Sequence, residues 1–116
     1  RGFSVVYDTA IHIISDYEAV KFRETSEESR DALRRYTACD LLIIDDLGTE
    51  LVTQFTLSVL YQVLNSRIIE NLPTIVSTNL DSTGIRSRYT PQIASRLLGT
   101  FDLVRFLGDD IRLRGK

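Results

Sequence analysis

The sequence predicts an α/β domain built on a parallel sheet, and three observations lead to this class. Residues 41–44 (LLII) are aliphatic and end abruptly in Asp45 and Asp46, and a short apolar run bounded by charge is typical of a strand buried on both faces of a parallel sheet. A second short run, residues 74–78 (TIVST), is β-branched and closes at Asn79. A helical repeat separates the two runs, and a strand–helix–strand unit of about 35 residues gives parallel strands.

The N-terminal part predicts a strand followed by two helical segments. Residues 3–7 (FSVVY) have strand propensity, and Asp8 with Thr9 can cap a helix that runs to about residue 23. Residues 25–35 (TSEESRDALRR) are polar and charged, which predicts a solvated loop and a short helix that reaches Tyr36. The sharper alternative is that the arginines of this segment contact a partner or DNA: Arg30, Arg34 and Arg35.

The segment between the two central strands predicts a helix. Its apolar residues recur on one face at Leu57, Leu60, Leu64 and Ile68, and Asn71 with Pro73 ends it. Because the two strands flanking this helix are expected to be parallel neighbours, Asp45, Asp46 and Asn79 should emerge at the same end of the sheet.

The C-terminal part predicts a loop, a short helix and a last strand. Residues 81–89 form a basic, polar connection. Thr90 followed by Pro91 is a good helix start, and this helix is expected to stop at Gly99 with Arg96 pointing away from its apolar face. Residues 101–107 (FDLVRFL) alternate in polarity and predict the last strand.

Length and composition bound the class of protein. With 116 residues, a net charge of −2 and one cysteine, the chain fits one domain or part of one, without an internal disulfide. No apolar run approaches the length of a membrane span. We therefore expect a cytoplasmic protein with no membrane partner and no separate second domain. The chain begins at Arg1 and contains no methionine, which suggests a piece of a longer protein.

The acid doublet is the strongest candidate for chemistry. Magnesium on nucleotide phosphates is held by one or two carboxylates and keeps several waters. Asp45 would then be the metal partner, and Asp46 would orient or activate the attacking water. The duller interpretation is that the doublet merely caps the next turn.

Two further residues are weaker candidates. Asn79 can donate a hydrogen bond to the attacking water or to a terminal phosphate, and the alternative is an Asx turn that closes a strand. Arg96 can reach a phosphate, since a guanidinium stabilises the charge that develops in phosphoryl transfer, and the alternative is a surface arginine.

Other polar residues predict no site. Thr49 and Glu50 are expected only to cap the following helix, His12 to belong to an amphipathic helix, and Cys39 to be a small buried side chain. No companion ligands lie at suitable spacing for a metal. The glycine-rich run G-x-x-x-x-G-K-[ST] that cradles nucleotide phosphates is also absent from the sequence, so these residues taken literally should bind ATP poorly.

Five segments occur in an order that is similar to a known family: DLLIIDDLGTE (residues 40–50), LYQVLNSRI (60–68), PTIVSTNL (73–80), IASRLLG (93–99) and GDDIR (108–112). The set resembles the AAA+ ATPase domain of bacterial replicative-helicase loaders, the DnaC family and its phage and Gram-positive relatives. The transposition helper IstB is a similar cousin. The likeness implies a P-loop NTPase (AAA+) core over residues 1–116, truncated and lacking the Walker A strand, loop and helix.

The resemblance also implies roles for single residues. Asp45 and Asp46 fall on the Walker B acids, with Asp45 toward Mg²⁺, through water, and Asp46 where many relatives carry glutamate. Asn79 falls on sensor 1, Arg96 on the arginine finger that acts on ATP held by a neighbouring subunit, and Arg112 on a sensor-2-like position.

The resemblance further implies a function for the complete protein. That function is ATP-dependent loading of a replicative helicase onto single-stranded DNA, with ATP and Mg²⁺ as cofactors and with self-association through Arg96. The alternatives are an IstB-like helper of a transposase and a non-catalytic scaffold that keeps the fold. Within the family sheet, the strand preceding the glycine-rich loop lies between those equivalent to residues 74–78 and 101–107. Without it, we expect residues 101–107 to lack a neighbour.

Overall fold

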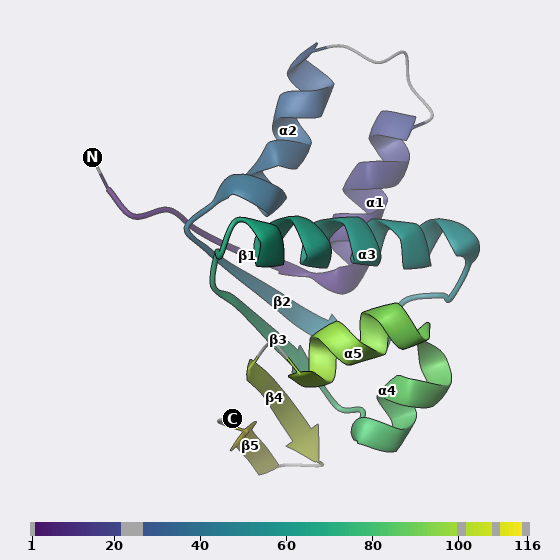
Figure 1. Cartoon of the computed structure of the whole chain (residues 1–116). Helices are drawn as coiled ribbons and strands as arrows, with labels where there is room; N and C mark the ends of the chain where they lie inside the picture. Colours follow the sequence, from purple (N-terminus) through teal and green to yellow (C-terminus); the bar gives the residue numbers. More distant parts are fainter. Residues whose placement is uncertain (1, 22–26, 100–101, 108–109, 115–116) are drawn as a thin grey trace.

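The computed structural model describes residues 2–21, 27–99, 102–107 and 110–114. Its elements follow in the order β1 (Val5–Thr9), α1 (Ala10–Lys21), α2 (Glu27–Ala38), β2 (Leu41–Leu47), α3 (Gln54–Ile69), β3 (Thr74–Thr78), α4 (Ser82–Arg88), α5 (Pro91–Gly99), β4 (Asp102–Leu107) and β5 (Asp110–Arg114). Strands therefore alternate with helices through most of the chain, and the predicted α/β class is confirmed (Figure 1).

The sheet has the order β1-β2-β3-β4-β5. The first four strands pair in parallel, and β5 returns antiparallel to β4. The predicted unit of two parallel strands joined by a helix is present, because β2 pairs directly with β3 and Leu47 lies opposite Thr78. The carboxyl ends of β2 and β3 consequently lie at the same edge of the sheet.

The expectation that the last predicted strand lacks a neighbour is wrong. β4 pairs in parallel with β3, with Ile75 opposite Asp102 and Thr78 opposite Arg105. The physical reason is that the outer edge of β3 presents unpaired backbone N–H and C=O groups, and β4 satisfies them. The order β1-β2-β3-β4 thus lacks the strand that the resemblance puts between the last two.

The helices cover one face of the sheet. Figure 1 shows α3 crossing in front of the strands, with α1 and α2 on one side of it and α4 and α5 on the other. Leu42, Ile44 and Val76 point into this layer and are almost fully buried. The expectation that β2 is buried on both faces is wrong, because Leu41 and Ile43 are only half-buried on the opposite face.

Local signals fixed most element ends. Thr9 accepts the N–H of His12 at the start of α1, and Thr90 accepts that of Ile93 at the start of α5, as predicted. The N-cap of α3 is Thr53, which forms a capping box with Thr56. The expectation that Thr49 and Glu50 cap this helix is therefore wrong.

Two elements were not expected. Residues 82–88 form helix α4 instead of a loop, because Asp81 caps it by accepting the N–H of Gly84 at 2.8 Å. The closing segment forms strand β5, which contains Arg112 opposite Arg105. Among the described residues, no helix is long and apolar enough to cross a membrane.

The core contains a buried arginine. Arg67 of α3 has no exposed surface, and its guanidinium donates to four groups around it. The acceptors are Thr74 Oγ1 at 2.6 Å, the carbonyl of Pro73 at 2.8 Å, the carbonyl of Tyr36 at 3.1 Å and Cys39 Sγ at 3.4 Å. Burial lowers the pKa of Arg67. This side chain joins α3 to the end of α2 and to the start of β3.

Candidate functional site

Asp45 is held by hydroxyl groups from both neighbouring strands. Tyr7 of β1 donates to Asp45 Oδ2 at 2.5 Å, and Ser77 of β3 donates to Asp45 Oδ1. Hydrogen bonds from Ser77 and then from Tyr7 lower the pKa of Asp45, and they outweigh the opposing effect of burial. The hydrogen bond between Tyr7 and Asp45 also raises the pKa of Tyr7. Asp45 is thus kept ionised at the open face of the sheet.

Asp46 sits on a bulge of β2. The β2–β3 register shifts between Ile44 and Leu47, and Asp46 adopts a φ of 62°, in the left-handed region. The backbone is fixed there on two sides, since the N–H of Asp46 donates to Ser77 Oγ at 3.1 Å and its carbonyl accepts from Thr49 Oγ1 at 2.9 Å. Two successive acids can therefore both reach the end of the strand, although a regular strand would point them to opposite faces.

Asn79 follows β3 at the same edge. Its strand neighbour Thr78 lies opposite Leu47 and donates to the carbonyl of that residue at 2.6 Å. Asn79 is exposed, as is Asp46. The prediction that the two acids and the asparagine share one end of a parallel sheet is confirmed as geometry, and their chemical roles remain predictions.

The acid edge fits a hydrated divalent cation. Each Asp45 oxygen accepts one hydroxyl donor, which leaves acceptor capacity on both oxygens. Ionised carboxylates and amide oxygens are the ligands that Mg²⁺ prefers, with waters completing its octahedron. Asp45 and Asp46 could therefore hold Mg²⁺ that is also bound to phosphate.

Arg96 lies in the helix layer, where α5 packs on α3. Its guanidinium donates to Asn65 Oδ1 at 3.0 and 3.1 Å, to the carbonyl of Gln92 at 2.9 Å, and lies 4.8 Å from the ring centroid of Tyr61. It is half-buried against the neighbouring helix. Arg112 lies on β5, at the other side of the sheet from β1.

Sequence reasoning missed Tyr7, Ser77 and Glu50 as parts of this site. A signal existed for Ser77, since it is a small polar residue inside a β-branched strand that neighbours the acid strand. Glu50 is buried and bonded to Tyr89 Oη, a contact across 39 positions that no local pattern indicates.

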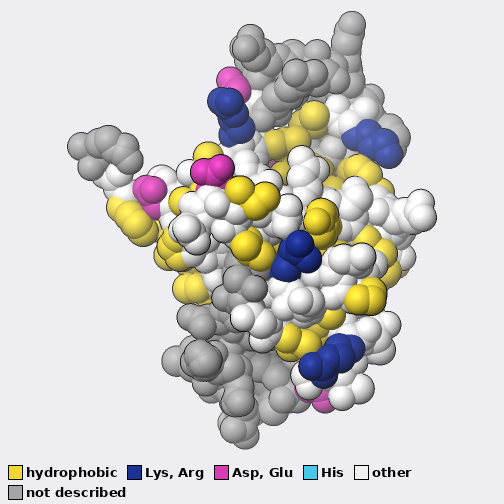
Figure 2. Space-filling view, viewed as in Figure 1, with side chains coloured by type: hydrophobic (Ala, Val, Ile, Leu, Met, Phe, Trp, Pro, Cys, Tyr) yellow, Lys and Arg dark blue, Asp and Glu magenta, His cyan; other side chains and the backbone are white. Residues whose placement is uncertain are grey.

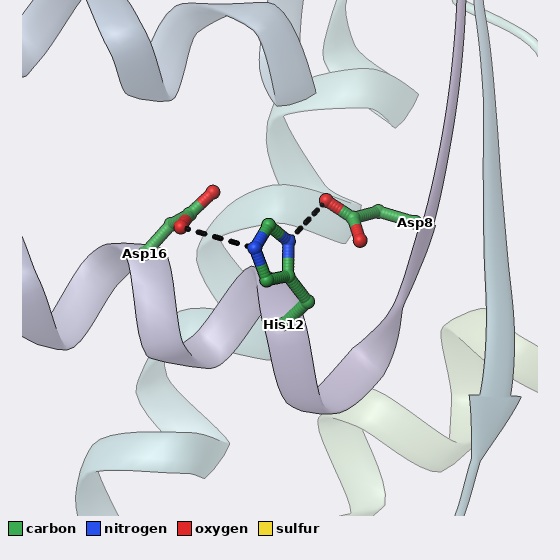
Figure 3. A group of neighbouring side chains, drawn as sticks. All are labelled: Asp8, His12 and Asp16. Carbon is green, nitrogen blue, oxygen red and sulfur yellow. Dashed lines mark hydrogen bonds and ion pairs between the residues drawn. The ribbon is translucent and has the colours of Figure 1, made fainter.

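A second polar cluster joins the end of β1 to α1. Figure 3 shows His12 between Asp8 and Asp16, with Nδ1 2.6 Å from Asp8 Oδ2 and Nε2 3.7 Å from Asp16 Oδ1. The expectation that His12 has no companion ligands is wrong, because the ligand atoms of Asp8, His12 and Asp16 lie within 4.8 Å of one another. Helical spacing of four residues brings His12 and Asp16 together, and Asp8 joins them from the end of β1, just before the helix begins.

This cluster is already satisfied by protein donors. The Tyr36 hydroxyl lies within hydrogen-bond distance of both carboxylates and can donate its proton to either one, and Arg35 lies 3.3 Å from Asp8 Oδ2. The hydrogen bond with Asp8 and the charge of Asp16 raise the pKa of His12. His12, Arg35 and Tyr36 thus give both carboxylates protein partners.

The titration of His12 tests this arrangement. The pKa of His12 is raised above its ordinary value of 6.5, so protonated His12 stabilises the folded state. This contribution is fully present at pH values below 6.5 and is lost as the pH rises through the pKa of the folded state. Because it is the only histidine, its NMR titration is unambiguous. We expect a midpoint above 6.5 that moves down in Asp8→Asn. A wild-type midpoint at or below 6.5 would contradict the cluster.

On the helix-covered face, the Lys and Arg side chains of the described residues lie apart from one another, as Figure 2 shows. Arg34 lies 3.5 Å from Asp31, and Arg35 packs 4.7 Å from the ring centroid of Tyr36. The side chain of Arg30 lies outside the described residues. Contact of these arginines with DNA therefore stays a prediction.

The strand order, the parallel register and the acid-ended strand β2 define an α/β fold built on a parallel sheet. The prediction of a DnaC-like AAA+ fold is confirmed by solved structures. The "DnaC helicase loader" matches with a TM-score of 0.73 at 17% identity, over 89% of this chain and 61% of that one.

Two further structures match over 94% of this chain. A "DNA replication initiation factor" gives a TM-score of 0.74 at 21% identity over 32% of its own length, and "AMPPCP-bound DnaA from Aquifex aeolicus" gives 0.70 at 22% over 33%. Identities this low show a shared fold alone. The chain thus spans about three-fifths of the first structure and about a third of the others. No protein-family model and no curated protein matches it.

Proposed function

We propose that the complete protein is an AAA+ ATPase of DNA replication that loads a replicative helicase onto single-stranded DNA in the cytoplasm. The observation that carries this proposal is the parallel pairing of β2 with β3, which puts Asp45, Asp46 and Asn79 at one sheet edge. The likeness in fold to a DnaC helicase loader and to an AMPPCP-bound DnaA also supports this proposal.

In this proposal each residue has one task. Asp45 would hold Mg²⁺ through water, and the bound ion would neutralise charge at the ATP phosphates. Asp46 orients the attacking water and accepts its proton, and Asn79 donates a hydrogen bond to that water or to the terminal phosphate. Arg112 is assigned to phosphate contact from β5. A phosphate-binding loop must be supplied from outside the sequence described here, since no G-x-x-x-x-G-K-[ST] run occurs in it.

Arg96 is assigned as the finger for a neighbouring subunit, and Arg96→Ala tests this. We expect turnover in the assembled protein to fall roughly 10²-fold. This loss is smaller than the loss of the arginine finger causes in GTPases, because Arg96 must first break its hydrogen bonds to Asn65 and Gln92. Mixing Arg96→Ala with Asp46→Asn should restore part of the turnover, since each subunit supplies what the other lacks. An equal loss in a strictly monomeric preparation would argue against action in trans.

The proposed function is tested by loading of the replicative helicase onto single-stranded DNA, with and without ATP. ATP-dependent loading by the full-length protein is the expected result. Activity with a transposase instead of a helicase would favour the IstB-like helper. The absent glycine-rich run keeps one other candidate open, a scaffold without catalysis. Failure of the full-length protein to bind ATP would support the scaffold.

A further inference from the structure

Glu50 is a carboxylate in an unusual place. Its side chain is only 3% exposed, although it lies in the loop between β2 and α3. Carboxylates are rarely buried this fully unless their oxygens are bonded. Oε1 accepts the N–H of Gly48 at 2.9 Å, and Oε2 accepts the O–H of Tyr89 at 2.5 Å. Arg88 lies 3.7 Å from Oε2 and also donates to the Glu50 carbonyl.

The first of these bonds reaches the acid edge. Gly48 comes two residues after Asp46 and has a φ of 112°, which favours glycine. A Cβ at this position would lie 3.0 Å from Leu80 Cδ1, so the loop passes very close to the residue that follows Asn79. The Glu50 carboxylate therefore fixes the backbone just behind Asp46.

The other bonds reach α4. Tyr89 is the C-cap of this helix, and its ring is 5% exposed. The helix begins at its N-cap Asp81, two residues after Asn79. One end of α4 thus lies just after β3 and Asn79, and the other end is bonded to Glu50. The Glu50 carboxylate therefore links the loop that follows Asp46 to the segment that follows Asn79.

We propose that Glu50 is a positioning residue that keeps Asp46 and Asn79 in fixed positions relative to each other during hydrolysis. We call the bonded group of Glu50, Gly48 N–H, Arg88 and Tyr89 the Glu50 clamp. It bonds the loop between β2 and α3 to α4, so that both segments move as one body. The inference rests on the proposed function, which gives Asp46 and Asn79 their roles. Catalytic groups need support of this kind, because small displacements of a group near the reacting atoms lower the rate strongly.

Tyr89→Phe is the main test, because it removes one hydroxyl and keeps the ring. In the full-length protein we expect kcat to fall roughly 10- to 100-fold, as for other supporting hydrogen bonds, with KM for ATP within about twofold. Exchange of the Gly48 amide should become roughly tenfold faster, since the Oε1 acceptor is less firmly held. Tyr17→Phe is the matched control, because this tyrosine of α1 is also buried, at 7% exposure.

A second pair of variants separates positioning from folding. Glu50→Gln keeps an acceptor for Gly48 N–H, whereas Glu50→Ala removes it and leaves Arg88 without a carboxylate. We expect Gln to retain clearly more turnover than Ala at equal content of folded protein.

Each outcome decides the inference. A fall in kcat at unchanged KM, with faster Gly48 exchange and a normal Tyr17→Phe, supports it. Wild-type kcat in Tyr89→Phe overturns it, even if exchange becomes faster. If the wild type itself shows no turnover, the proposed function is wrong. The clamp is then judged by exchange alone: lost protection of Gly48 supports it and unchanged protection overturns it.

Discussion

Asp46→Asn is expected to preserve ATP binding in the full-length protein and to lower turnover roughly 10²- to 10⁴-fold, the usual contribution of a general base. The substitution is well suited to the site, because Asn tolerates the left-handed conformation that Asp46 adopts at a φ of 62°. The backbone bonds to Ser77 and Thr49 can therefore remain. The substitution then removes only the carboxylate to which the proposed function assigns the proton of the attacking water.

The measurement is single-turnover hydrolysis beside equilibrium binding of labelled ATP. Asp31→Asn is the matched control, since Asp31 is an exposed acid of α2 that forms a surface ion pair with Arg34. Unchanged turnover in Asp46→Asn would refute its assigned role. Loss of ATP binding together with turnover would assign Asp46 to binding instead of to the chemical step.

Arg67→Ala is expected to lower the free energy of unfolding by at least about 3 kcal/mol, since each unpaired buried acceptor costs on the order of 1–3 kcal/mol. The guanidinium donates to the carbonyls of Tyr36 and Pro73 and to Thr74 Oγ1, and alanine removes this donor from all three, although the N–H of Leu42 still donates to the Pro73 carbonyl. Arg67→Lys should restore only part of the loss, because a single ammonium cannot reach acceptors placed around a planar fork.

Urea unfolding followed by circular dichroism measures this effect. Arg34→Ala is the control, because Arg34 is 75% exposed and its loss should change stability by less than about 0.5 kcal/mol. Wild-type stability in Arg67→Ala would show that water or rearranged side chains satisfy Pro73 and Tyr36 equally well.

Much of the fold was predictable from local pattern. The aliphatic run before Asp45, the β-branched run before Asn79 and the helix between them predicted a parallel unit that the structure contains. The Thr90–Pro91 helix start was also correct. Helix α4 was missed because a seven-residue segment of polar and basic residues shows almost no periodicity, and its cap at Asp81 outweighed that.

The burial of residues was less predictable than their secondary structure. The sequence predicted β2 as buried on both faces, and the helix layer covers only one. Arg67 carries a charge, yet it is fully buried, because four acceptors from outside its own helix surround it. Composition records the charge of a side chain but not the acceptors that the fold brings to it.

By itself the sequence determined the position of the acid doublet and of Asn79 at strand ends, since strand length and polarity are local properties. Only the tertiary structure decided which distant side chains hold them: Tyr7 on Asp45 across 38 positions, and Tyr89 on Glu50 across 39. The physical reason is that strand register and helix placement follow from packing over the whole sheet, and a shift of one residue in β1 would turn Tyr7 to the other face.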